Sequence, residues 1–294
     1  MANIYKNIDS NVFKTWFLMV GFGIFVIAIG WILAQYYGDF NILVFAIIIA
    51  FVQTFGSYWF SDKLVIAATH AQPIKEEDDQ RLYHLIENLC ITAGLPMPKI
   101  YIMPELQPNA FATGRDKNHS AIVFTQGLLD MLDESEIQGV AAHELSHIGN
   151  RDTLLQTVVV GLVAVLSLLS QWFLRIGRWD GDRDNDSQAG AIIGILALAG
   201  VILAPIVGTL IQLAISRKRE FLADSSAVLL TRYPDGLANA LMKISASPIV
   251  MQMQNDSVAH LFIASPFKGE KLSGLFATHP PIQERIAAIK NIAI

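Results

Sequence analysis

The chain has 294 residues, of which 53% are hydrophobic and only 16% are charged, and its mean hydropathy is +0.43. Ordinary soluble domains carry about 25% charged residues, so this composition favours an integral membrane protein. The formal net charge of −5 argues against the clustered positive charge that nucleic-acid binding requires, so we expect no nucleic-acid partner. The single cysteine, Cys90, excludes an intrachain disulfide framework.

Two uncharged stretches near the N-terminus predict a transmembrane hairpin over residues 1–61. We expect the spans at about residues 16–36 and 40–60, because about 20 apolar residues are needed to cross a hydrocarbon core of about 30 Å. The first stretch is too long for the apolar part of a signal peptide and lacks a small-residue cleavage site, so we interpret it as retained. A polar stripe of the second span, which we expect to face protein, contains Gln53, Thr54 and Ser57.

Residues 62–152 have the composition of a water-exposed domain. An amphipathic helix is expected after the acidic residues 76–79, which suit the positive end of a helix dipole, and should end before Gly94. Three short segments rich in β-branched and aromatic residues then predict strands of a small sheet. These segments are Lys99–Met103, Ala110–Thr113 and Ala121–Thr125. The expected fold class is therefore a mainly α integral membrane protein with a small β-sheet.

The most informative segment is His143-Glu144-Leu145-Ser146-His147. On a helix, positions i and i+4 share a face, so both imidazoles can reach one Zn2+ while Glu144 holds a water at the open position of the metal. Asp133 and Glu136 form a capping box that predicts where this helix begins. The motif is short enough to arise by chance, so further residues have to support it.

Two further apolar stretches predict a second transmembrane hairpin over residues 153–216, with spans at about 153–174 and 189–215. Two crossings return the chain to the same face of the membrane. Residues 217–294 are therefore expected to complete the domain that residues 62–152 begin, with four transmembrane helices in total.

Glu220 is the best candidate for the third metal ligand, because a catalytic zinc usually takes three protein ligands and a water. Glu220 and Asp224 are spaced i and i+4, so one can ligate the metal while the other accepts a hydrogen bond from a ligating imidazole. Taken alone, two carboxylates near a helix start are more often solvated. The second hairpin favours ligation instead, because two crossings bring both carboxylates to the same side of the membrane as the histidines.

The distribution of basic residues predicts which side of the membrane each region occupies. The short loop 35–39 has no Lys or Arg, whereas basic residues flank the other ends of the first two spans. The positive-inside rule therefore places the N-terminus and both polar regions in the cytoplasm. Three arginines in the loop 175–188 go against this bias.

Four segments together resemble the HtpX family of membrane zinc endopeptidases, which are relatives of the CAAX prenyl proteases. The segments are Ala142–His147, Arg219–Asp224, Asn109–Ala112 and Thr278–Pro281, and the resemblance covers essentially the whole chain. It implies a gluzincin fold in a bacterial inner membrane, facing the cytoplasm and degrading unfolded or misassembled membrane proteins as quality control under stress. It also implies that His143, His147 and Glu220 bind one Zn2+ and that Glu144 is the catalytic base.

A third part of the expected site is a strand that binds substrate. An edge strand can add an extended substrate through backbone hydrogen bonds without reading much sequence. We expect this role for Asn109, Ala110, Phe111 and Ala112, with an ordinary structural strand as the alternative.

The last candidate for the site is His279. It precedes a Pro280-Pro281 pair, which suits the start of a helix that contains Arg285. The resemblance brings His279 to the site, where it can stabilise an oxyanion. From the sequence alone, a loop histidine without a role is an equal alternative.

Two other functions stay open at this point. A site-specific prenyl-protein protease has the same motifs, although four spans are few for enclosing a large intramembrane chamber. A membrane protein that binds zinc without catalysis would normally close the site with four protein ligands. The expected partners are unfolded membrane proteins and the lipid bilayer, and the sequence leaves the oligomeric state open.

Overall fold

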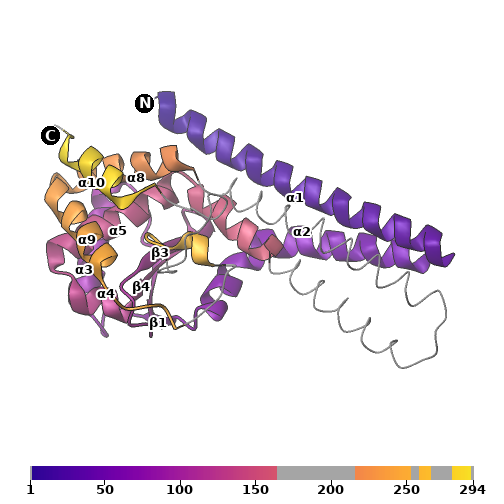
Figure 1. The fold of residues 1–294 in the computed structure, drawn as a ribbon, viewed down its shortest axis with the longest axis horizontal. Coiled ribbons are helices and arrows are strands. Elements are labelled where there is room, and N and C mark those ends of the chain that lie inside the picture. The colour runs from indigo at the N-terminus through magenta and orange to yellow at the C-terminus, as the bar shows by residue number, and fades with distance from the viewer. Residues whose placement is uncertain (1, 164–215, 253–257, 266–279, 293–294) are drawn as a thin grey trace.

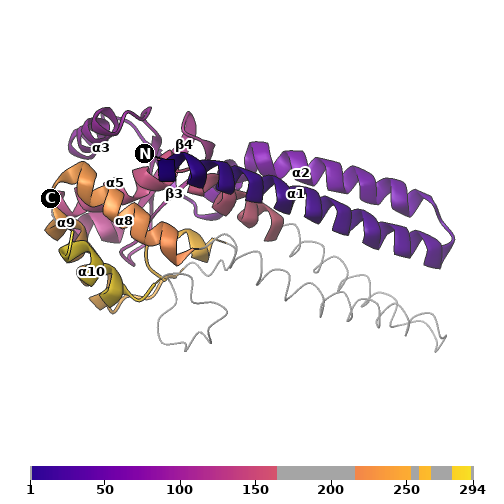
Figure 2. The same ribbon diagram turned by 90° about the horizontal axis from the view of Figure 1, so that it is seen from above.

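Two long helices extend from a body that contains a sheet and several shorter helices. The computed structural model describes residues 2–163, 216–252, 258–265 and 280–292. Helices α1 (Ala2–Tyr37) and α2 (Asn41–Ala68) run antiparallel and leave the body side by side (Figures 1 and 2). Gly38 in the turn between them has φ +66°, a left-handed conformation that glycine adopts without steric cost.

Helices α1 and α2 contain the segments Ile8–Tyr37 and Asn41–Phe60, each long and apolar enough to cross a membrane. Their outward faces carry large exposed apolar side chains, such as Phe17 at 67% and Phe51 at 63% exposure. Such surfaces are unfavourable in water and favourable against lipid acyl chains, so the two helices have the character of membrane spans. The span expected near residues 40–60 continues as regular helix to Ala68.

A third apolar helix, Asp152–Val163, packs against α1 and α2 and buries nearly all of its side chains. A Cβ atom at Gly161 would lie 3.0 Å from the Ser57 hydroxyl oxygen, so the two helices touch closely there. Ser57 and Gln53 are buried and Thr54 is partly buried, so the predicted polar stripe of α2 faces protein at two of its three positions. This helix is the beginning of the span expected at 153–174.

The rest of that span and the whole of the span expected at 189–215 lie outside the described residues. The structure therefore supports a mostly helical membrane protein with two candidate spanning helices among the described residues, and leaves four spans as a prediction.

The body contains a four-stranded mixed sheet in the order β1-β2-β4-β3. Its strands are β1 (Gln72–Ile74), β2 (Lys99–Met103), β3 (Ala110–Asp116) and β4 (His119–Thr125). Strands β2 and β4 are parallel, whereas the other neighbouring pairs are antiparallel. The three predicted strands are confirmed. Strand β1 was not predicted, because three mostly exposed residues give no recognisable pattern.

Helix α5 (Glu134–Gly149) lies at the centre of the body, where it packs against β3, α8 and α9 (Figure 1). It begins at the predicted capping box, in which Asp133 and Glu136 each accept a hydrogen bond from the other's backbone N–H. The remaining helices are α3 (Gln80–Ala93), α4 (Gln126–Met131), α8 (Arg217–Thr231), α9 (Pro234–Ala246), η2 (Ala259–Leu261) and α10 (Ile282–Lys290). Helix α3 ends at Gly94, as expected.

Candidate active site

The two histidines of α5 lie one helical turn apart on a buried face. His143 is 1% exposed and His147 is 5% exposed. Their Nε2 atoms are 3.1 Å apart, so both rings present the same nitrogen to one point. Helix α8 brings Glu220 to that point from a region 73 residues beyond His147 in the sequence, and Glu220 is itself only 2% exposed.

The three side chains form a donor set that fits a zinc-sized cation. The Glu220 Oε2 atom lies 3.8 Å from His143 Nε2, and its Oε1 atom lies 3.7 Å from His147 Nε2. One donor atom from each residue can be chosen so that all lie within 4.8 Å of one another. Donor atoms of a tetrahedral zinc site lie about 3.3 Å apart, given metal–ligand distances of about 2.0–2.1 Å. The separations of 3.1, 3.7 and 3.8 Å are close to this value, so the residues could hold such an ion.

Each imidazole has its second nitrogen against a buried carboxylate. His143 Nδ1 lies 2.9 Å from Asp224 Oδ1, and His147 Nδ1 lies 3.0 Å from Asp152 Oδ2. A carboxylate at this position fixes the tautomer and the ring orientation of a metal-binding histidine. Both rings are therefore held with Nε2 directed toward Glu220, which is the arrangement that metal binding requires.

Asp224 was expected in this role, but Asp152 was missed. It follows His147 by five residues, beyond the helix that carries the motif. The available signal was an acidic residue at the very start of a predicted span, where an ionisable group needs a partner.

The negative field of these carboxylates favours a positive charge at the site. Burial disfavours the charged imidazole, but the hydrogen bond to Asp152 and the charge of Glu220 outweigh it and raise the pKa of His147 to about 9. The same field would stabilise a cation between the two rings.

Arg285 on α10 is a fully buried support for Asp224. Its Nε and Nη2 atoms donate to the two carboxylate oxygens of Asp224 at 2.9 and 2.7 Å, and its Nη1 atom donates to the Ile263 carbonyl at 3.0 Å. Burial opposes ionisation of Asp224, but the adjacent guanidinium outweighs it and holds the pKa of this carboxyl well below its usual range. The sequence singled out Arg285 without a partner, and the structure supplies one.

Glu144 is buried at 2% exposure beside the histidine that precedes it on α5. Desolvation raises the pKa of its carboxyl above the ordinary range, while the opposite charges of neighbouring groups act against this shift. A carboxylate with a raised pKa is a better proton acceptor near neutral pH than an ordinary surface glutamate.

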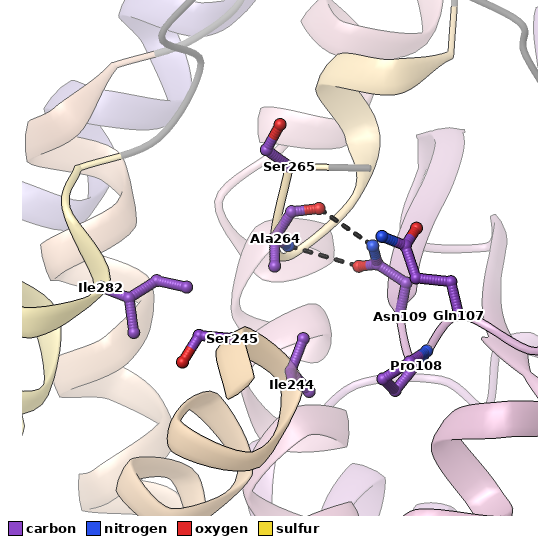
Figure 3. Close-up of a pocket in the computed structure, with 8 residues that line it drawn as sticks. All are labelled: Gln107, Pro108, Asn109, Ile244, Ser245, Ala264, Ser265 and Ile282. Atoms are coloured by element: carbon purple, nitrogen blue, oxygen red, sulfur yellow. Dashed lines mark hydrogen bonds between the residues drawn. The ribbon is translucent and has the colours of Figure 1, made fainter. Parts of the chain in front are cut away.

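The predicted substrate strand forms the start of β3, at the edge of the sheet, and part of it is paired with the chain itself. The Asn109 side chain donates to the Ala264 carbonyl at 2.9 Å and accepts from the Ala264 N–H at 3.3 Å (Figure 3). The Ile263 N–H donates to the Ala110 carbonyl at 2.9 Å. Phe111 is a core residue whose ring packs edge-on against Phe262.

The backbone N–H and C=O groups of successive residues in β3 point alternately toward β4 and away from it. Asn109 exchanges backbone and side-chain hydrogen bonds with Thr125 of β4, so in an antiparallel ladder the groups of Ala110 and Ala112 point away from β4. Residues 263–264 cover Ala110, whereas no backbone hydrogen bond joins Ala112 to another segment among the described residues.

A small cavity of about 170 Å³ lies beside Asn109 (Figure 3). Its lining combines amide, hydroxyl and apolar groups from Gln107, Pro108, Asn109, Ile244, Ser245, Ala264, Ser265 and Ile282. Pro281 precedes α10, as predicted. His279 lies outside the described residues, so its predicted role stays a prediction.

Two imidazoles and a carboxylate that converge on one point, with a buried glutamate next to the first imidazole, define the site of a metallopeptidase. The chain belongs to peptidase family M48, whose family model matches residues 76–293, and within it to the HtpX proteases. The predicted resemblance is thereby confirmed.

Several curated relatives are named protease HtpX homolog. One from Syntrophobacter fumaroxidans is 41% identical over 285 residues, covering 95% of this chain and 99% of the relative. One from Pyrococcus furiosus is 44% identical over 257 residues, covering 86% and 87%, and one from Tropheryma whipplei is 39% identical over 291 residues, covering 98% of both. The crystal structure of S. mikatae Ste24p matches with a TM-score of 0.50 and 18% identity, over 98% of this chain and 67% of that one, which shows a shared fold.

Proposed function

We propose that this metallopeptidase is a zinc-dependent endopeptidase, anchored in a membrane, that cleaves unfolded or misassembled membrane proteins. The observation that carries the proposal is the cluster of His143, His147 and Glu220, in which both imidazoles are oriented by buried carboxylates. Three protein ligands leave a position for water, which is typical of catalytic rather than structural zinc sites.

The zinc ion and each residue of the site would have a separate role in peptide hydrolysis. A bound zinc ion would supply Lewis acidity and would lower the pKa of a water molecule to about 7. Glu144 takes the proton from the attacking water and passes it to the leaving amine, for which its buried carboxyl is suited. Of the two residues that the sequence offers for stabilising the oxyanion of the tetrahedral intermediate, we keep His279, because the side chain of Asn109 is already paired with Ala264.

The proximity of the site to the membrane helices supports a membrane-protein substrate. The apolar helix Asp152–Val163 begins five residues after His147, and it packs against both candidate spans. An unfolded loop near the bilayer surface could pair with the backbone of Ala112, to which no described segment is hydrogen-bonded on this side, while a folded protein could not offer an extended backbone there. Pairing at Ala110 would require displacement of Ile263 and Ala264.

We further propose four spans, with both parts of the catalytic domain in the cytoplasm and the turn between α1 and α2 on the other side. Single cysteines placed at Asp39, in that turn, and at Asn118, in the hairpin between β3 and β4, test this orientation in a Cys90→Ser background, because both positions are exposed. A membrane-impermeant thiol reagent added to intact cells should label Asp39→Cys and spare Asn118→Cys. The opposite labelling would invert the proposed topology.

The enzymatic proposal is tested on the full chain purified in detergent, with zinc content and casein cleavage measured together. We expect about one zinc per chain and cleavage in the wild type, zinc without cleavage in Glu144→Gln, and loss of both in His147→Ala. Wild-type protein without zinc would refute the proposed cofactor. Preferential cleavage of a prenylated CAAX peptide at one bond would support the site-specific alternative instead.

A further inference from the structure

The turn that follows α5 is tied to the first membrane helix. Arg151 in this turn has φ +55°, a conformation that is uncommon for a residue with a side chain, so other contacts must hold it. Asn11 of α1 supplies two of them, because its Nδ2 atom donates to the Asn150 carbonyl at 3.2 Å and to Asp152 Oδ1 at 2.7 Å. Asn11 and Asp152 are buried at 3% and 1% exposure.

The two oxygens of Asp152 have different partners. Oδ1 accepts the hydrogen bond from Asn11, and Oδ2 lies 3.0 Å from the Nδ1 atom of His147. The terminal torsion of an aspartate is broad, so a carboxylate held at one oxygen can rotate, whereas one held at both oxygens has a fixed plane. Asn11 thereby determines how Asp152 faces the imidazole.

Arg219 is a weaker second contact at the same place. Its Nη1 atom lies 3.6 Å from Asp152 Oδ1 and donates to Asn11 Oδ1 at 3.4 Å. The amide of Asn11 is therefore the nearer partner of Asp152, and its oxygen accepts the hydrogen bond from the Arg219 guanidinium. Among the described residues, removal of Asn11 would leave this oxygen of a buried carboxylate with only the longer ionic contact, which is costly in a site shielded from water.

We propose that Asn11 is a positioning residue of the metal site, which acts through Asp152 on the orientation of His147. Helix α1 then supports the zinc site as well as anchoring the protein, since Asn11 contacts Asp152 and Asp152 in turn contacts the metal ligand His147. The inference rests on the proposed function in one respect, namely that His147 binds zinc.

The test is a double-mutant cycle on the full chain in detergent, with zinc affinity measured by competition against a chromogenic chelator. Loss of a residue that orients a metal ligand typically weakens metal binding by about 10–100-fold. We expect that range for Asp152→Ala and about 10-fold for Asn11→Ala, which acts one residue further away. The double variant should bind zinc no more weakly than Asp152→Ala, because the effect of Asn11 passes through Asp152.

The matched control is Thr15→Val, one turn further along α1. Thr15 is 1% exposed and donates its hydroxyl to the Asn11 carbonyl, so its loss perturbs the same part of α1 and leaves the Asn11 amide in place. We expect wild-type zinc affinity in this variant. The visible spectrum of cobalt-substituted protein should shift in Asn11→Ala and stay unchanged in Thr15→Val, which separates ligand orientation from general stability.

Three results would overturn the inference while the proposed function still holds. They are wild-type zinc affinity in a folded Asn11→Ala protein, full additivity of the two losses in the double variant, and an equal loss in Thr15→Val. If Asn11→Ala does not fold, Asn11→Leu replaces it, since this variant keeps the volume of the side chain and removes its hydrogen bonds, and the same loss of zinc affinity is expected. Wild-type protein that binds no zinc would instead refute the proposed function itself.

Discussion

Arg285→Met should destabilise the protein strongly, because it leaves the buried carboxylate of Asp224 without its main counter-charge. Removing one partner of a buried ion pair typically costs about 3–5 kcal/mol. The contact of 2.9 Å between His143 Nδ1 and Asp224 Oδ1 remains, whereas the hydrogen bond to the Ile263 carbonyl is lost as well. We therefore expect a loss of about 3–4 kcal/mol, or a fall in the melting temperature of roughly 10 °C.

The assay is thermal unfolding in detergent, followed by tryptophan fluorescence at one heating rate, since membrane proteins often unfold irreversibly. The matched control is Arg81→Met. Arg81 forms an ion pair of 2.8 Å with Glu134, but both side chains are more than half exposed, so its loss should cost less than about 1 kcal/mol.

A companion variant checks the cause of the predicted loss. Asp224→Asn combined with Arg285→Met removes the unpaired charge, so it should melt above Arg285→Met alone. A melting temperature of Arg285→Met within about 2 °C of the wild type would refute the reasoning.

Three further expectations concern packing, reactivity and capping. Gly139→Ala should lower the free energy of unfolding by about 1–3 kcal/mol, because its Cβ atom would lie 2.6 Å from the Leu237 backbone nitrogen. The control is Gly149→Ala in the same helix, whose Cβ atom would lie 3.6 Å from the nearest side-chain atom, so thermal unfolding should show a neutral or stabilising effect. Cys90 should resist alkylation at pH 8.5 until the protein is denatured, since burial raises the pKa of its thiol to about 11; labelling of the folded protein would contradict this. Asp133→Ala should cost about 1 kcal/mol in the same unfolding assay. Hydrogen bonds lower the pKa of Asp133, so in the wild type its contribution is present above the ordinary aspartate range and is lost as the pH falls through the lowered value; stability of the variant should accordingly fall less in acid.

Features that depend on near neighbours in the chain could be predicted from the sequence. The capping box at Asp133 involves residues three positions apart, and the spacing of His143 and His147 follows from the period of the helix. The three longer strands and the first two spans were likewise visible as runs of apolar residues. The third metal-binding candidate, Glu220, could be proposed because two membrane crossings return the chain to its starting side.

The supports of the site depend on residues far apart in the sequence, and only the tertiary structure decided them. Asn11 and Asp152 are 141 residues apart, Asp224 and Arg285 are 61 apart, and Asn109 and Ala264 are 155 apart. No helical or strand period connects such positions, so the sequence offered Arg285 without a partner and Asn109 as a substrate-binding residue. Burial gives these contacts their strength, because a carboxylate or amide removed from water must find a partner inside the protein, and the tertiary placement of α1, α8 and α10 determines which partner it finds.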